Sequence, residues 1–410
     1  MTAEKIRYSN DKQMFETLLA HRDVKRVNQF IEKKEEEGPL GTRRRLLATS
    51  VRLSRNMAPE VHRMADECIE KLDMKIPHEL YVYSSPQFNA ACFKPEDGQL
   101  FVMFSSSLLE AFEGSELKFV IGHEFGHHVY RHHDIPIGYL LQGNARPDPR
   151  LALDLFTWSR NAEVSADRAG AYCAEDLNGV ARSLFKLASG LSDKIIQFNL
   201  EEFLKQVDEM RLEDEQPGQG APKEDWFSTH PFSPLRVHAL KLFHDSELMQ
   251  DSGNSVEQLE VGVQRLMSLM EPSYLEARTD TASAMRHLLF AGAISIADAE
   301  GGITQSEIEV FEKFFGKGEF NKGLDIERIK SKVDQRLKRV LEQTSETQRM
   351  QVLRDLCVIA RADGKVSSAE RAILDEMAMG LEISRAFICQ TLEQDLDPDE
   401  TSRCEQYRNR

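Results

Sequence analysis

The stretch Ile121-Gly122-His123-Glu124-Phe125-Gly126-His127 decides the fold expected for this chain. Residues four positions apart share one helix face, so His123 and His127 can bind a single metal ion with the carboxylate of Glu124 beside them. Apolar residues recur around them at helical spacing and predict a helix with one buried face: Leu117, Val120, Ile121, Phe125 and Val129. The stretch therefore indicates a zinc hydrolase.

The His-Glu-x-x-His motif and the glycine within it also have simpler explanations. With 12 histidines in 410 residues, His-Glu-x-x-His arises by chance in roughly 3 of 100 such chains. Gly126 costs a helix about 1 kcal/mol relative to alanine, which indicates that a sheet or a substrate passes close to its backbone. The alternative is a harmless irregularity of the helix.

A catalytic zinc ion usually has three protein ligands and keeps its fourth position for water, so the site needs one more ligand. The segment Asn161-Ala162-Glu163-Val164-Ser165-Ala166-Asp167 supplies it. Glu163 and Asp167 share a helix face, which lets Glu163 bind the metal while Asp167 orients a ligand histidine. The alternative is that both carboxylates belong to a solvated helix face.

Together these segments resemble the gluzincin metallopeptidases, a family that includes the CAAX prenyl endopeptidases and the HtpX-like membrane quality-control proteases. The resemblance rests on residues 121–127, on Glu163 with Asp167, and on Ser228-Thr229-His230-Pro231 followed by Arg236. It covers roughly residues 45–250 and implies an α+β fold, a mostly helical zincin-like domain with a small sheet. Its strands are expected near residues 79–83, 88–93 and 99–104.

The resemblance supports a specific chemistry. One zinc ion is expected on His123, His127 and Glu163, and Glu124 is expected to act as general base and then general acid while water hydrolyses a peptide bond. The substrate is expected to be a peptide or an unfolded protein.

Further roles are implied by the resemblance alone. His230 and Arg236 are expected to stabilise the oxyanion. Alternatively, His230 has a core or capping role before the proline that follows it, or it swings onto zinc in a latent state. Asn89, Ala90 and Ala91 are expected to lie on an edge strand that pairs with the main chain of the substrate.

Three other histidines follow the metal-binding pair. His128 is one position off the ligand face, and His132 and His133 lie at the expected end of the helix, where cations complement the helix dipole. All three are interpreted as non-ligands.

The C-terminal part of the chain contains an internal repeat. The segment from Ala297 to Glu307 recurs from Ala360 to Glu370, at an offset of 63 residues. Each copy has an acidic residue, a glycine, a β-branched residue and a glutamate between two apolar helices. This pattern resembles the all-helical tellurite-resistance TerB-like domain.

The loops of the repeat also resemble EF-hands, but Ile296 and Ile359 stand where a calcium loop needs its first carboxylate, which excludes a standard EF-hand. The remaining interpretations are helix-capping turns or a second metal or partner site. The second would use Asp298, Glu300, Glu307, Asp363 and Glu370.

Composition limits the function classes. The net charge of −16 and the pI near 5.3 argue against nucleic acid or anionic lipid as the main partner. No stretch approaches the roughly 20 apolar residues of an integral membrane segment, and the start of the chain lacks an apolar signal core. The six scattered cysteines are typical of reduced thiols, so a cytoplasmic location is expected.

These observations predict the organisation of the chain: a charged helical region (1–45), a zinc metallopeptidase domain (46–270), a linker (271–280), a TerB-like domain (281–395) and a polar tail (396–410). Two functions remain open. One is a cytosolic zinc endopeptidase in protein quality control or stress response. The other is an interaction scaffold or latent protease whose C-terminal module senses a metal or binds a protein partner.

Overall fold

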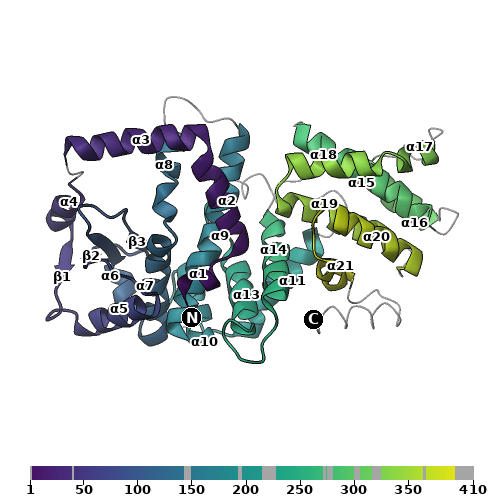
Figure 1. Ribbon diagram of the computed structural model, residues 1–410. Coiled ribbons are helices and arrows are strands. Elements are labelled where there is room, and N and C mark those ends of the chain that lie inside the picture. The colour runs from purple at the N-terminus through teal and green to yellow at the C-terminus, as the bar shows by residue number, and fades with distance from the viewer. Residues whose placement is uncertain are drawn as a thin grey trace. The chain divides into compact units, whose positions relative to one another are not determined.

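The computed structural model describes residues 2–38, 41–142, 149–192, 196–214, 228–270, 274, 280–299, 305–315, 325–362 and 366–392 (Figure 1). The chain forms two compact units, Met1–Val207 with Phe227–Gly253 and Asp208–Trp226 with Asn254–Arg410. Among the described helices, none combines the length and apolar character needed to cross a membrane. The domain boundaries drawn from the sequence stay predictions.

The charged N-terminal region is helical, as expected. It contains α1 (Ala3–Ile6), α2 (Ser9–Ala20), α3 (Arg22–Glu37) and α4 (Thr42–Thr49). Apolar side chains of α2 and α3 pack into a core with α8 (Ile137–Gln142) and α9 (Pro149–Ala174), including Phe15, Val24 and Trp158. Figure 1 shows α2 running beside α9.

The first unit has a small mixed sheet in the order β1-β2-β4-β3. Its strands are β1 (Val51–Leu53), β2 (His78–Tyr83), β3 (Ala90–Cys92) and β4 (Leu100–Ser105). β2 and β4 are parallel, whereas β1 on β2 and β3 on β4 are antiparallel. Three strands confirm the sequence prediction. β1 is not predicted, because three residues are too short to show a period-2 pattern.

Helix α7 (Gly114–Val129) carries the metal-binding stretch and packs on α9 at close backbone distance. A Cβ atom on Gly126 would lie 2.9 Å from the Cβ of Ala169, and one on Gly170 would lie 2.6 Å from the carbonyl oxygen of Phe119. The backbone passing Gly126 is thus helix α9, so the expectation of a sheet or a substrate at this glycine is wrong. Helical periodicity predicts that a face is buried but not which element covers it.

Further helical segments lie before, between and after these two helices along the chain. They are α5 (Pro59–Lys71), α6 (Ser106–Ala111), η1 (His132–Asp134), α10 (Leu177–Ser189), α11 (Leu200–Asp214) and α13 (Ser233–His244). α5, α10 and α13 pack on α7 or α9. Helices α7 and α9 are therefore held in place by neighbouring helices on several sides.

The described elements of the second unit are helices, which confirms the predicted all-α domain. They are α14 (Val256–Met267), η2 (Ser268–Met270), α15 (Asp280–Ala297), α16 (Gln305–Phe315), α17 (Ile326–Lys330), α18 (Val333–Gln343), α19 (Glu346–Ala360), α20 (Ser368–Gly380) and α21 (Arg385–Leu392). α15 contacts α18, α19 and α20 around a core that includes Leu288, Leu353 and Leu374.

The cysteines only partly follow the expectation of reduced thiols. Cys68, Cys92, Cys173 and Cys357 are free. Cys389 is disulfide-bonded, so the expectation is wrong there. Spacing along the chain cannot show which cysteines pair, because pairing depends on the fold.

Candidate metal centre

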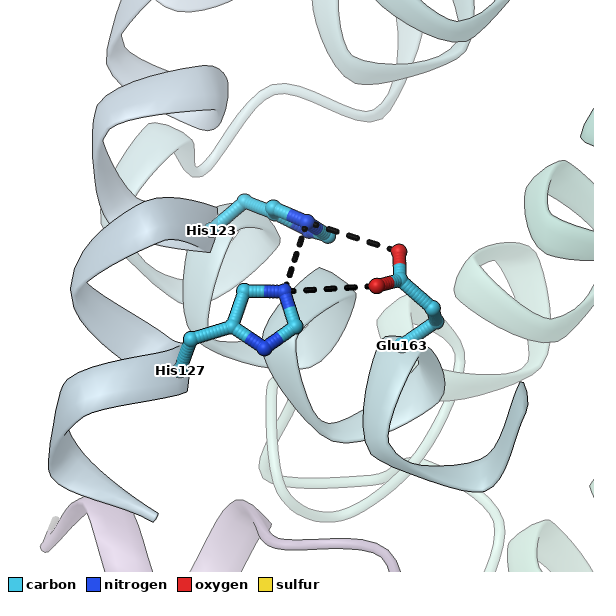
Figure 2. A group of neighbouring side chains, drawn as sticks. All are labelled: His123, His127 and Glu163. Carbon is cyan, nitrogen blue, oxygen red and sulfur yellow. Dashed lines mark hydrogen bonds and ion pairs between the residues drawn. The ribbon is translucent and has the colours of Figure 1, made fainter. Parts of the chain in front are cut away.

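Helices α7 and α9 bring together the three side chains predicted to bind zinc (Figure 2). His123 Nε2 lies 3.5 Å from one oxygen of Glu163, His127 Nε2 lies 3.3 Å from the other, and the two nitrogens are 3.2 Å apart. Within the part of the chain that the structure describes, this is the one cluster of three or more potential metal ligands.

The chemistry of these atoms fits a zinc ion. The Oε2 atom of Glu163 is buried without a hydrogen-bond partner, which is costly for a carboxylate. Arg236 lies 3.5 Å from this oxygen without a hydrogen bond to it, so a metal ion would supply the missing contact. The Nδ1 atoms of His123 and His127 both have other partners, so each ring turns its Nε2 atom toward the cluster. Two imidazole nitrogens and one carboxylate are a common donor set for catalytic zinc.

Asp167 and Arg236 support the first histidine. Asp167 Oδ1 lies 2.9 Å from His123 Nδ1. Arg236, from α13, donates to both oxygens of Asp167, from Nε at 2.8 Å and from Nη2 at 2.6 Å. The bidentate pair holds Asp167 in place, and Asp167 in turn orients the ring of His123.

The charge state of the carboxylates suits a metal site. Burial alone would raise the pKa of Glu163, but His230, His123 and His127 hold it well below its ordinary value. Burial likewise opposes ionisation of Asp167, yet Arg236 and His123 lower its pKa. Both groups are therefore anionic at neutral pH.

His127 has a support that the sequence interpretation misses. Its Nδ1 atom lies 2.9 Å from Nδ1 of His132, whose Nε2 atom lies 3.2 Å from Asp11. Among the described residues, His132 lies outside the cluster of potential metal ligands, but it is buried and contacts His127. Its position five residues after His127 is the available signal, whereas Asp11 is too far away in the chain to be recognised.

His230 and Arg236 differ in exposure. The side chain of His230 is 61% exposed, and its Nε2 atom lies 3.5 Å from Glu163. Arg236 is buried and lies 3.5 Å from the other oxygen of Glu163. Arg236 donates two hydrogen bonds to Asp167, whereas His230 is exposed, so His230 is the better placed of the two to reach a bound substrate.

Glu124 and strand β3 lie on the same side of α7. Burial, and secondarily the carboxylate of Glu124, raise the pKa of the Cys92 thiol in β3 well above its usual value. β3 is at the edge of the sheet, and Asn89 directly before it pairs with Ser105 through its backbone. Within the described residues, the outer side of β3 has no strand partner.

The C-terminal residues singled out in the repeat are only partly described. Asp298 forms an ion pair with Lys330 at 2.8 Å. Glu370 completes a capping box with Ser367 at the start of α20, as the helix-capping alternative predicts. Glu300, Asp363 and the side chain of Glu307 lie outside the described residues. A second metal or partner site here stays a prediction.

A histidine pair on one helix, a glutamate on a second helix that crosses it and a small adjoining sheet define a zincin-like metallopeptidase. Comparison with known families agrees. Residues 55–142 and 150–243 match peptidase family M48. Residues 286–390 match the tellurite resistance protein TerB. The chain therefore contains an M48 metallopeptidase domain followed by a TerB domain.

Several known proteins resemble parts of the chain. The plastoglobule-localized metallopeptidase 48, chloroplastic, of Arabidopsis thaliana is 32% identical over 170 residues, which cover 39% of this chain and 49% of that protein. A protease HtpX homolog of Helicobacter pylori strain J99 is 22% identical over 217 residues, 44% of this chain and 66% of that protein. Another, from strain Shi470, is 24% identical over 166 residues, 32% of this chain and 53% of that protein. The matches thus span about half to two thirds of these relatives. No solved structure matches the chain.

Proposed function

We propose that this protein is a zinc-dependent endopeptidase that hydrolyses peptides or unfolded proteins. One observation carries the proposal: the ligand atoms of His123, His127 and Glu163 lie within 4.8 Å of one another, and Glu124 follows His123 on the same helix. The M48 match supports metal-dependent proteolysis in particular.

The placement of the residues supports a mechanism for this proposal. When bound, zinc supplies a Lewis acid that makes water more acidic and polarises the scissile carbonyl. Glu124 accepts a proton from the attacking water and passes one to the leaving amine nitrogen as the carbon–nitrogen bond breaks. His230, exposed at the rim of the cluster, donates to the oxyanion that develops on the carbonyl oxygen.

Strand β3 offers a way to hold the substrate. Its outer edge can form main-chain hydrogen bonds with an extended peptide, with Asn89, Ala90 and Ala91 lining it. Contacts between α7 and β3, and the electrostatic influence of Glu124 on Cys92 in β3, support this edge as the docking strand. Because main-chain pairing tolerates many sequences, we expect an extended or unfolded segment to be the substrate.

Three finer features belong to the same proposal and rest on the sequence alone. They are a cytoplasmic location, a role in protein quality control or stress response, and the recruitment of a protein partner by the TerB domain.

The decisive experiment compares the parent protein with Glu124→Gln on an unfolded, fluorescence-quenched protein substrate. We expect the glutamine variant to keep its zinc and to lose about 10²–10⁴-fold in kcat, because the amide cannot accept the proton. Glu110→Gln, at an exposed position of α6, is the matched control and should cleave like the parent. Equal cleavage by parent and Glu124→Gln, or none by the zinc-loaded parent, would overturn the proposal.

A second experiment tests the ligand assignment. We expect Glu163→Gln to bind zinc more weakly, because a neutral amide replaces the anionic ligand. Zinc content is read by atomic absorption after dialysis. A variant that keeps a full equivalent of zinc would exclude Glu163 as a ligand.

A further inference from the structure

We infer that Asp11, in helix α2, is a positioning residue for the metal centre that acts on the ligand His127 through His132. The inference rests on the proposed metal site. It gives the N-terminal helices a role in that site, although residues 2–54 lie outside the part of the chain that matches family M48.

The contacts form a continuous line from the ligand to a buried carboxylate. His127 Nδ1 lies 2.9 Å from His132 Nδ1, and His132 Nε2 lies 3.2 Å from Asp11 Oδ2. With both rings neutral, one proton arrangement satisfies these contacts. His132 donates from Nε2 to Asp11 and accepts at Nδ1 from His127, which leaves the lone pair of His127 Nε2 for the metal.

Asp11 is itself held rigidly. It is fully buried, and besides His132 it accepts from Arg7 Nε at 2.8 Å, Ser165 Oγ at 2.7 Å and Trp158 Nε1 at 3.0 Å. Ser165 and Trp158 belong to α9, the helix that carries Glu163. The carboxylate of Asp11 thus contacts His132, which contacts His127 on α7. It also contacts α9, the helix that carries the proposed ligand Glu163.

The arrangement parallels the support of the other histidine. His123 contacts Asp167, and Arg236 holds Asp167. His127 is supported by Asp11 in the same way, except that His132 stands between them. Carboxylates that orient metal-binding histidines fix the tautomer and raise the basicity of the ligand, and their loss typically weakens metal affinity about 10–100-fold.

A purely structural role for Asp11 makes a different prediction. If Asp11 served only to anchor α2 on α9, its replacement would lower the stability of the fold without a specific effect on the metal. A substitution that loosens the same N-terminal core without touching Asp11 or His132 would then have the same consequence.

The test measures zinc affinity of the full-length chain by competition with a chromophoric chelator. Asp11→Asn removes the charge, and His132→Phe removes both ring nitrogens but keeps an aromatic ring against Trp158. Val24→Ala is the matched control, because it loosens the core that the N-terminal helices form with α9 without removing a contact of Asp11 or His132. We expect each of the first two variants to bind zinc about 10–100-fold more weakly, and the control to stay within about threefold of the parent.

Two further readouts separate the possible outcomes. The double variant Asp11→Asn with His132→Phe should bind zinc no more weakly than the single variant with the lower zinc affinity. Both substitutions act through the same contacts to His127. The visible spectrum of the Co²⁺ form should shift in both single variants and not in Val24→Ala. Circular dichroism of the metal-free proteins checks the fold, and if Asp11→Asn does not fold, His132→Phe decides.

The result that overturns the inference is parental zinc affinity in His132→Phe or in a folded Asp11→Asn. An equal loss in Val24→Ala would also overturn it. If the parent itself binds no zinc, the proposed metal site fails instead, so the two failures are distinguishable.

Discussion

Arg236 illustrates how an observed contact changes the role inferred for a residue. The family resemblance implies that it stabilises the oxyanion, but its Nε and Nη2 atoms both donate to Asp167. A guanidinium held in this way cannot turn toward a substrate without removing two hydrogen bonds from a buried carboxylate. At the scale of single residues, we therefore assign Arg236 to positioning, and the oxyanion role of this arginine stays a prediction.

The substitution Arg236→Lys tests this assignment. Lysine keeps the charge but cannot reproduce the bidentate contact, so Asp167 and His123 become less well oriented. We expect zinc affinity to fall about tenfold and excess zinc to restore most of the cleavage. Chelator competition and kcat at saturating zinc are the measurements. Full zinc affinity with kcat reduced about 10²–10³-fold would favour the oxyanion role.

At the scale of elements, the crossing of α7 and α9 determines the distance between the ligands. Glycines make this crossing possible, because a Cβ atom at Gly122, Gly126 or Gly170 would approach the opposite helix to 3.0 Å or less. His123 and His127 belong to one helix and Glu163 to the other, so the same close approach that requires glycine also brings the three ligands together.

Gly126→Ala tests the crossing. Helix propensity alone predicts a gain of about 1 kcal/mol, but the new Cβ atom would lie 2.9 Å from Ala169 Cβ. Overpacking a rigid contact costs about 1–3 kcal/mol, so we expect a net loss of stability and weaker zinc binding. Gly138→Ala in α8, where a Cβ atom meets no neighbour within 4 Å, is the control and should be neutral or stabilising. Denaturant unfolding of both variants gives the answer, and a stabilised Gly126→Ala would contradict the packing explanation.

At the scale of the whole molecule, the chain has two compact units, and the second contains its own hydrophobic core around residues such as Met350 and Phe387. The proposed zinc ligands all belong to the first unit. A metal that binds only the folded state stabilises the unit that binds it. The two units should therefore respond differently to metal removal.

Calorimetry of the full chain with and without a chelator tests this difference. Zinc at about 1,000 times its Kd stabilises by about 4 kcal/mol, which corresponds to roughly 10 °C in Tm for a unit of this size. We expect chelation to lower the Tm of the first unit and to leave the Tm of the second unit unchanged. Glu163→Gln should show little response to the chelator. An equal shift of both transitions would contradict a metal site confined to the first unit.

Local sequence determined much of this protein. The fold class, three strands of the sheet and the helical nature of both the N-terminal region and the TerB domain are confirmed. His123 and His127 are four residues apart, as are Glu163 and Asp167, which is about one helix turn. This spacing indicates which side chains share a helix face before any tertiary structure is known. That zinc occupies these ligands stays a prediction.

Other features were decided by the tertiary structure. The helix against Gly126, the strand β1, the target of Arg236 and the path from His127 to Asp11 all depend on which segments the fold brings together. Asp11 and His132 are 121 residues apart, and no local period relates them. The physical reason is that helix geometry specifies which residues are neighbours within a helix. The packing of side chains and the pairing of buried charges determine which residues meet between helices.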